Sequence, residues 1–357
     1  MKERDHSLDL VKVTATILIM LHHYQQVTGA RFDRGINFYG GRFYFGYVVE
    51  LFFLLSGYFM HKYVILIRER KVGFFEYMTK RIIRFVPMLT VCALSFAFLS
   101  GIYKHMYGQY FMDKEITLWG LIVSCLGIQE GWVFKNPGIN NPTWYISVLM
   151  LCCVVLYLCV YISARLKLNE KWLFVFLIFV GAGFFEFKVK WLFASPLLGR
   201  GYYSFFFGLL LYDLMNGQIA KRKAFVLIAA AVLAAFTSLM ILKPGFVNEG
   251  QGYILTFIVY PAVLIIVRWG LPDPVVNRKV WGTLGCISFD VFMWHVNILI
   301  VFSIIEYLSG HSISYGDPAV MLLFVLICFA VGTASYYLIE KPAGKKLAAL
   351  CEMGENK

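Results

Sequence analysis

The chain has 357 residues, of which 60% are hydrophobic and only 15% are charged, and its mean hydropathy is +0.69. Soluble domains are about 45–50% apolar and about 25% charged, so this composition excludes an ordinary soluble enzyme and makes the bilayer the solvent. The formal net charge of +12 comes from short basic clusters between apolar stretches, which argues against a nucleic-acid partner. The eight cysteines show no metal or disulfide spacing, and no metal site is expected.

Apolar stretches, each near the roughly 20 residues that cross a bilayer, recur from end to end. They predict an all-α, polytopic membrane helix bundle of about ten transmembrane helices, over residues 11–28, 44–67, 82–103, 143–163, 172–187, 200–215, 224–242, 253–269, 284–307 and 319–339. The first stretch lacks a small-residue cleavage site and contains His22 and His23. We therefore interpret it as a retained span rather than a signal peptide.

Basic clusters predict the orientation, because cytoplasmic loops carry an excess of lysine and arginine. The clusters placed in the cytoplasm are the basic residues of 68–84, Lys221–Lys223, Arg268 with Arg278 and Lys279, and Lys341 with Lys345 and Lys346. Residues 104–117 and 129–143 then lie outside, so the short apolar stretch 118–128 is expected to be re-entrant or interfacial. Both termini are predicted to be cytoplasmic, with residues 1–343 as the membrane domain and 344–357 as a short cytoplasmic tail.

The first span combines a cation and an imidazole on one helical face. Lys12 and His23 are eleven residues apart, which on a helix is about three turns, roughly 20° from eclipsed and about 16 Å. Asp9 precedes Lys12 by one turn, where an i,i+3 ion pair can hold the lysine. Such a face offers a cation for an anionic group and an imidazole further along. The alternative is a basic anchor flank with a snorkelling histidine.

The second span contains an acid and a pair of small residues. Glu50 lies within the apolar run VVELFFLLSGYFM and needs a partner there, either His23 or a cation. Ser56 and Gly57 permit either close helix packing or backbone approach to a ligand. Both interpretations of the Ser-Gly pair stay open on the sequence alone.

Further polar candidates open the third and fourth spans and lie within the ninth. Arg81 and Arg84 stand one turn apart at a span end, where paired guanidiniums suit phosphate recognition but also serve as topology signals. Trp144 begins the fourth span in NNPTWYISVLM. Asp290 and His295 lie in the apolar surroundings of ISFDVFMWHVNIL.

Together these segments resemble the acyltransferase-3 family of integral-membrane O-acyltransferases. The resemblance runs from Ser7 to Pro342 and is carried by LDLVK through His23, ELFFLLSGYF, KRIIRFVP and ISFDVFMWH, with YYLIEKP closing the last span. It implies that a histidine separated from a basic residue by ten intervening residues is essential for transfer. Here these are His23 and Lys12, where the family favours arginine.

The resemblance also assigns the remaining motifs. The family's arginine pair, Ser-Gly motif and Tyr-x-Trp-His motif fall on Arg81 and Arg84, Ser56 and Gly57, and Phe292-Met293-Trp294-His295. A glutamate that many members carry five residues after the fourth-span tryptophan is Leu149 here, and Glu50 is the candidate to replace it. Some relatives carry a C-terminal hydrolase-like domain. Since this chain ends soon after Pro342, transfer is expected to be completed by the membrane domain or a partner.

The resemblance implies acyl-CoA, foremost acetyl-CoA, as co-substrate without a bound cofactor. Its phosphates are expected near Lys12, Arg81 and Arg84. His23 is expected to act as general base or acyl acceptor, with Glu50 orienting it. Ser56, Gly57, Trp144, Asp290 and His295 are further candidates for substrate contacts.

The expected acceptor is a hydroxyl of a surface or lipid-linked glycan at a bacterial plasma membrane, where membrane lipids are the remaining partners. Two alternatives stay open. One is a transporter or flippase, in which the buried ionisable residues bind and move a solute without acyl turnover. The other is an acyltransferase for a small hydroxylated metabolite.

Overall fold

The computed structural model describes residues 6–32, 37–41, 44–217, 223–242 and 251–355, without the side chains of 141 and 352–355. Within these ranges the elements are helices, apart from one isolated bridge between Trp191 and Ala194. This confirms the all-α class, and a helix or an end-to-end run of helices covers each predicted span. Lys221 and Arg222, from one predicted basic cluster, lie outside the described residues.

Seven helical runs in the described part of the chain are long and apolar enough to cross a membrane. They are Phe45–Arg68, Phe74–Tyr107, Trp144–Leu166, Lys223–Leu242, Gln251–Gly270, Asp273–Ser309 and Pro318–Cys351. The other predicted spans form α1 (Ser7–Thr28), α6 (Glu170–Glu186) and α7 (Pro196–Asn216). Helix α6 has only 17 residues, and α1 carries several polar side chains. The count of about ten crossings and the sides of the termini therefore stay predictions.

The chain divides into two compact units. Unit 1 comprises residues 1–62, 171–179 and 202–288, and unit 2 comprises 63–170, 180–201 and 289–357. Unit 1 is built from α1, η1 (Phe45–Tyr47), most of α2 (Val48–Arg68), parts of α6 and α7, α8 (Lys223–Leu242), α9 (Gln251–Ile254), η6 (Leu255–Val259), α10 (Tyr260–Ile265), η7 (Ile266–Gly270), α11 (Asp273–Val276) and the start of α12 (Lys279–Ser309). Unit 2 contains α3 (Phe74–Tyr107), η2 (Phe111–Asp113), α4 (Leu118–Leu126), η3 (Asn141–Thr143), α5 (Trp144–Leu166), the rest of α6, α7 and α12, α13 (Pro318–Ser335), η8 (Tyr336–Glu340) and α14 (Lys341–Glu355).

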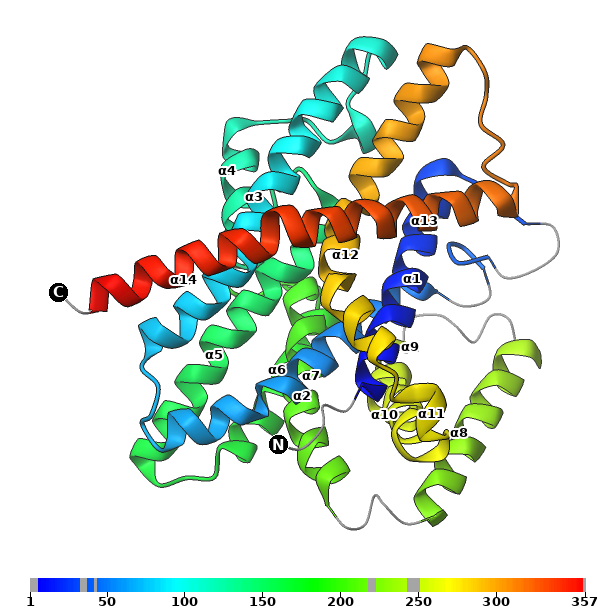
Figure 1. Ribbon diagram of the computed structural model, residues 1–357. Coiled ribbons are helices and arrows are strands. Elements are labelled where there is room, and N and C mark those ends of the chain that lie inside the picture. Colours follow the sequence, from blue (N-terminus) through cyan, green and yellow to red (C-terminus); the bar gives the residue numbers. More distant parts are fainter. Residues whose placement is uncertain (1–5, 33–36, 42–43, 218–222, 243–250, 356–357) are drawn as a thin grey trace. The chain divides into compact units, whose positions relative to one another are not determined.

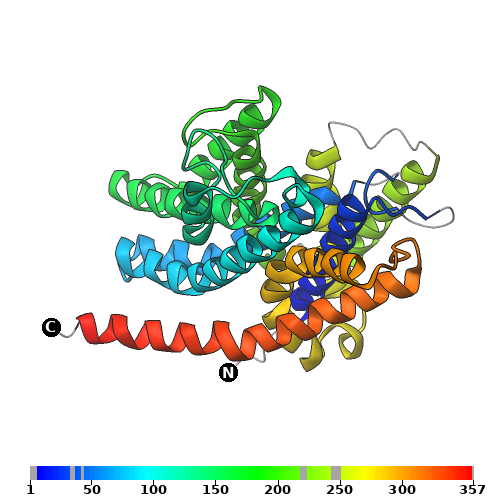
Figure 2. The same ribbon diagram turned by 90° about the horizontal axis from the view of Figure 1, so that it is seen from above.

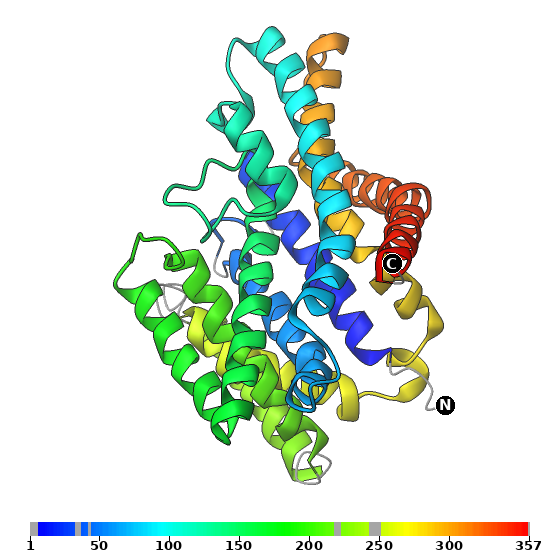
Figure 3. The ribbon, with the colours of Figure 1, turned by 90° about the vertical axis from the view of Figure 1, so that its left-hand side faces the viewer.

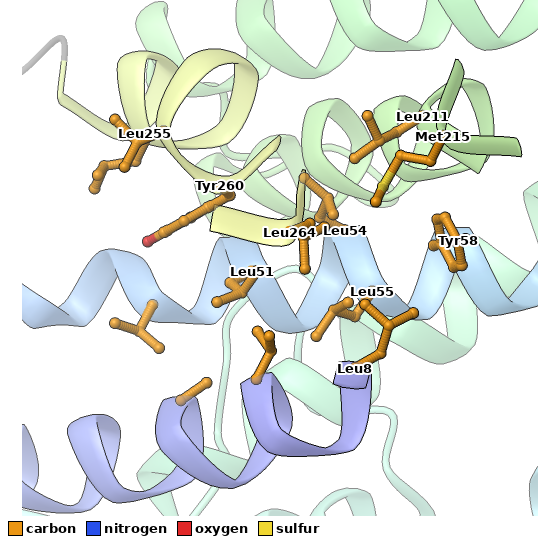
Figure 4. Close-up of a cluster of buried hydrophobic side chains, with 14 residues drawn as sticks. Leu8, Leu51, Leu54, Leu55, Tyr58, Leu211, Met215, Leu255, Tyr260 and Leu264 are labelled. Atoms are coloured by element: carbon orange, nitrogen blue, oxygen red, sulfur yellow. The ribbon is translucent and has the colours of Figure 1, made fainter. Parts of the chain in front are cut away.

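The core of unit 1 is an aliphatic cluster between α1, α2, α7 and the η6–α10 run (Figure 4). Leu8 of α1 lies beside Leu55 of α2, and Tyr58 lies at the same end, so the two helices run antiparallel (Figure 4). Lipid tails are as apolar as leucine, so these contacts stabilise the unit through close packing rather than through removal from water.

Helices α2 and α7 cross at two glycines in unit 1. A Cβ atom added at Gly57 would fall on the carbonyl oxygen of Phe205, and one added at Gly208 would fall on the carbonyl oxygen of Leu54. Each glycine thus lets one backbone approach the other, as small residues do in membrane helix pairs. This gives Gly57 a packing role, which is one of the two interpretations its sequence left open.

In unit 2, α3 is a continuous helix of 34 residues that runs through Pro87. It lies beside the part of α12 beyond Phe289 (Figures 1 and 3), where Asn297 Nδ2 donates to the Cys92 carbonyl oxygen at 3.2 Å. The short stretch predicted not to cross forms α4, which packs on α3 and has nine residues. At about 1.5 Å per residue such a helix is too short for a hydrocarbon core of about 30 Å.

The last helices of unit 2 lie end to end. Asp317 begins α13 by accepting from Ala319 N at 2.8 Å, with Pro318 at the first helical position, where its missing N–H leaves no bond unmade. Helix α13 continues through the π-helical turn η8 into α14 as one long rod (Figure 2). The predicted C-terminal tail is therefore helical over most of its length.

The basic clusters predict which loops face the cytoplasm. In a variant whose exposed Cys351 is replaced by serine, a cysteine at the exposed Lys135 should react with an impermeant thiol reagent in intact cells, and one at the exposed Glu69 should react only after permeabilisation. Native Cys351 should behave like the cysteine at Glu69. Equal labelling of both introduced cysteines in intact cells would contradict the orientation.

The α2–α7 crossing predicts a strong effect of a single methyl group. Gly57→Ala should lower the melting temperature of the purified protein, because overpacking against backbone costs about 1–3 kcal/mol or more. Gly101→Ala in α3 is the matched control, since a Cβ atom there meets nothing within 4 Å, and it should be neutral or slightly stabilising. Equal melting temperatures for Gly57→Ala and Gly101→Ala would contradict the close backbone approach of α2 and α7 at Gly57.

Candidate functional site

The predicted ion pair at the start of α1 is present. Lys12 Nζ lies 3.2 Å from Asp9 Oδ1, and the other oxygen, Asp9 Oδ2, lies 3.2 Å from His6 Nδ1. Asp9 is buried, and the backbone of α12 lies close to it at Gly285. The carboxylate thus fixes the ammonium of the lysine, which also stands 4.3 Å from the centre of the Phe59 ring. Lys12 is held, yet about a quarter of its side chain is exposed.

A second cation gathers at the same end of unit 1. Arg268 in η7 donates to the Tyr58 hydroxyl at 2.5 Å, and its other terminal nitrogen lies 3.4 Å from Asn216 Oδ1. Helix α1 contacts η7, and Tyr58 is the neighbour in sequence of Phe59, against which Lys12 rests. Lys12 and Arg268 therefore approach adjacent residues of α2. Two cations therefore lie near the same end of α2 in unit 1.

At the other end of α1, two buried side chains fasten the segment 37–41. Gln25 Oε1 accepts from the backbone N–H of Phe38 at 2.5 Å and of Tyr39 at 3.1 Å. His22 Nδ1 lies 3.0 Å from the Phe38 carbonyl oxygen, so Nδ1 carries a proton and donates it there. The His22 ring also meets the ring of Tyr44 edge-on, at 5.1 Å between centroids. His22 is thus committed to holding this segment.

His23 differs from its neighbour in burial. It is half-buried, whereas His22 is buried. Consecutive residues on a helix point about 100° apart, and the His23 ring meets the His22 ring edge-on, at 5.3 Å between centroids. Lys12 and His23 both lie on the uninterrupted helix α1, as the sequence predicts.

Glu50 has a hydrogen-bond partner that the sequence analysis did not predict. Its side chain is fully buried, and Oε1 accepts from the Tyr203 hydroxyl of α7 at 3.0 Å. With α1 and α2 antiparallel and Leu8 beside Leu55 (Figure 4), Glu50 lies about level with Val13 of α1. That places it nearly three turns, or ~15 Å, from His23 along the helix. Direct orientation of His23 by Glu50 stays a prediction that this register does not favour.

The arginine pair lies in unit 2, on α3, and its members differ. Arg81 is 3% exposed and its guanidinium is stacked between Tyr63 and Tyr77, 4.0 and 3.7 Å from the ring centres. Arg84 keeps 48% of its side chain exposed and pairs with Glu340 at 2.7 Å. A phosphate can reach Arg84 more readily than Arg81. Phosphate binding by both residues stays a prediction.

The remaining predicted residues also lie in unit 2, except Ser56, which is half-buried on α2 of unit 1. Trp144 is half-buried and stacks with Arg200 at 5.4 Å. His295 is fully buried, with Nδ1 bonded to the Phe292 carbonyl oxygen of its own helix. Asp290 accepts from the Ser335 hydroxyl at 2.7 Å. Among the described residues no group of three His, Cys, Asp or Glu side chains lies close enough to hold a metal ion.

Sequence reasoning assigned no site role to Tyr203, Ser335, Glu340 or Arg268. Arg268 was counted only as an orientation signal, although an arginine at the end of an apolar run was visible. Glu340 stands in the quoted segment YYLIEKP, where an acid inside a span was a signal by itself. The hydroxyls of Tyr203 and Ser335 gave no signal, since such residues are common in membrane helices.

One comparison with known proteins found a match. The family model described as an acyltransferase domain, acyltransferase 3, matches residues 5–339. That range includes α1 from its first residue and the whole of α3, α5, α12 and α13. No curated protein and no solved structure matched the chain.

The two neighbouring histidines should respond differently to truncation. His22→Ala removes a buried hydrogen bond and edge-on ring contacts, and leaves the Phe38 carbonyl without its donor, which costs about 1–3 kcal/mol. The melting temperature should fall accordingly. His23→Ala should change it less, because the ring is half-buried. A larger loss for His23→Ala than for His22→Ala would contradict this assignment.

Proposed function

The chain belongs to the acyltransferase-3 family of membrane acyltransferases, and from this premise we propose that it transfers an acetyl group from acetyl-CoA to a hydroxyl of a surface or lipid-linked glycan. The family match supports acyl transfer in general, and the donor, the acceptor and a bacterial plasma membrane are part of the proposal. The observation that carries it is α1, which holds a fixed cation near one end and a half-buried imidazole near the other.

The donor is proposed to bind by its phosphates at the Lys12 end of unit 1. Lys12 is fixed by Asp9, and Arg268 by Tyr58, so neither cation has to be ordered when an anion arrives. Arginine can grip a phosphate with two parallel hydrogen bonds, while lysine supplies a point charge. The thioester lies at the far end of the extended arm of coenzyme A. An arm laid along α1 reaches toward His23, about 16 Å away by the rise of the helix.

His23 is proposed to act as general base. Neutral imidazole removes the proton of the acceptor hydroxyl as its oxygen attacks the thioester carbonyl, and the tetrahedral intermediate collapses by breaking the C–S bond. The imidazolium then returns the proton to the departing thiolate, so the products are the ester and free coenzyme A. An imidazole can accept a proton in the first step and return it in the second, so it is suited to both.

Glu50 is proposed to act on this imidazole through space. Two unit charges ~15 Å apart at an effective dielectric constant of ~20 interact with ~1.1 kcal/mol. That is too weak to orient a ring, but it favours the imidazolium that forms during proton transfer. The hydrogen bond from Tyr203 holds the carboxylate in place for this role.

The experiment uses the purified chain in lipid nanodiscs with labelled acetyl-CoA and a lipid extract that contains the acceptor glycans. His23→Gln keeps size and hydrogen bonding but provides no effective base, so transfer should fall by at least about 10²-fold. Lys12→Ala and Arg268→Ala should instead raise the KM for acetyl-CoA, and Lys12→Arg should retain activity.

The controls separate chemistry from folding and from transport. His22→Ala, with rates scaled to its folded fraction, should keep substantial activity. Near wild-type transfer by His23→Gln would make His23 structural and refute its role as base. Wild-type protein that moves glycan across vesicle membranes without consuming acetyl-CoA would refute the enzymatic proposal in favour of a transporter.

A further inference from the structure

Two buried carboxyl groups of unit 2 meet among apolar helices. Asp290 of α12 is 0% exposed and Glu340 of η8 is 8% exposed. Asp290 Oδ1 accepts from the Ser335 hydroxyl at 2.7 Å, and Glu340 Oε1 pairs with Arg84 Nη1 at 2.7 Å. The two carboxyl groups lie close enough to interact electrostatically with each other. We call these four residues the carboxyl clamp.

One oxygen atom of each carboxyl group lacks a hydrogen-bond donor in the described part of the chain. Asp290 Oδ2 and Glu340 Oε2 are buried, and no donor among the described residues serves either atom. An ionised carboxylate only accepts hydrogen bonds, so two of them cannot bond to each other. A hydrogen bond between the two carboxyls therefore requires one proton, and that proton also supplies the missing donor.

We propose that Asp290 and Glu340 form a proton-binding site that holds one shared proton, so that the pair carries a single negative charge matched by Arg84. The ligand is a proton, and the residues that bind it come from α12 and η8. Ser335 and Arg84 fix the outer oxygen of each carboxyl. The site is independent of the proposed reaction.

The charges of the clamp support this occupancy. With both acids ionised, the pair would carry two negative charges against one guanidinium, and an uncompensated charge among apolar helices is costly. With one proton the clamp is neutral. The buried thiol of Cys92 on α3 also lies near Asp290, and it brings no positive charge.

Close packing of α12 against α13 holds the residues of the carboxyl clamp in position. A Cβ atom at Gly332 of α13 would lie 2.8 Å from the backbone nitrogen of Val291, so α12 and α13 are in near backbone contact one residue from Asp290. Ser335 follows one turn later and reaches Asp290 directly. The wider π-helical turn of η8 ends at Glu340, and such turns often occur at functional sites.

Infrared spectroscopy of the full-length purified protein tests the shared proton. Wild-type protein at pH 7 should show carbonyl-stretch absorption of a protonated carboxylic acid that shifts in D₂O. Asp290→Asn and Glu340→Gln should each lose the same absorption, because the amide then donates the hydrogen bond and the remaining acid is ionised. Loss in neither variant, or in only one of them, would overturn the proposal.

Glu130 provides a matched control for the spectra. It is also a buried acid of unit 2, but its two oxygens accept from Ser195 Oγ at 2.5 Å and from Asn136 Nδ2 at 2.8 Å, so it needs no proton. Glu130→Gln should leave the absorption unchanged. If Glu130→Gln removes it, the absorption belongs to another acid and the assignment to the clamp fails.

Melting temperatures test the charge balance separately. Each single amide variant keeps one carboxylate in the clamp to balance the charge of Arg84 and should melt within a few degrees of wild type. The double variant leaves Arg84 without a carboxylate and should lose far more than the sum of the two single losses. If the losses in melting temperature are additive, the two carboxyl groups do not share one negative charge and the proposal fails. A dependence of the wild-type melting temperature on sodium or calcium, absent in Asp290→Asn, would identify a metal cation instead and equally overturn it.

Discussion

The cost of an ionisable side chain among apolar helices is the constraint on which the rest of this structure depends. Each such group discussed above has a named partner within its own unit. In unit 1 these are the pair of Lys12 with Asp9 and the hydrogen bond of Glu50 with Tyr203. In unit 2 the guanidinium of Arg84 faces Glu340. Because these partners come from different turns or helices, satisfying the polar groups also fixes how the helices pack.

The polar residues of α1 fall into two groups, those that hold the helix in position and those that remain partly exposed. Asp9, His22 and Gln25 are buried and bind other parts of the protein, so they hold the helix in place. Lys12 and His23 keep part of their surface open. In a membrane enzyme, buried hydrogen bonds are needed to position the few groups that contact substrates. Helix α1 contains both kinds of residue within 22 residues.

The sequence predicted the elements better than their contacts. Apolar length located the helices, and an i,i+3 spacing predicted the Asp9–Lys12 pair, because both signals are local. The bond between Glu50 and Tyr203 joins residues 153 positions apart, and Ser335 lies 45 positions from Asp290. A helix that is apolar all round carries no periodic sign of which face meets which neighbour. The His22–Phe38 contact was missed for a related reason, since one imidazole in a His-His pair looks like the other.

The crossing of α2 and α7 has a consequence for how the chain can vary. At Gly57 and Gly208 the atoms that exclude a side chain belong to backbone carbonyls of the facing helix. No replacement of a neighbouring side chain can therefore make room for a methyl group at either position. Elsewhere in the core of unit 1 an enlarged residue can be offset by a smaller one opposite it. Both positions should therefore remain glycine as the sequence changes, whereas the leucines around the crossing can be replaced by other aliphatic residues.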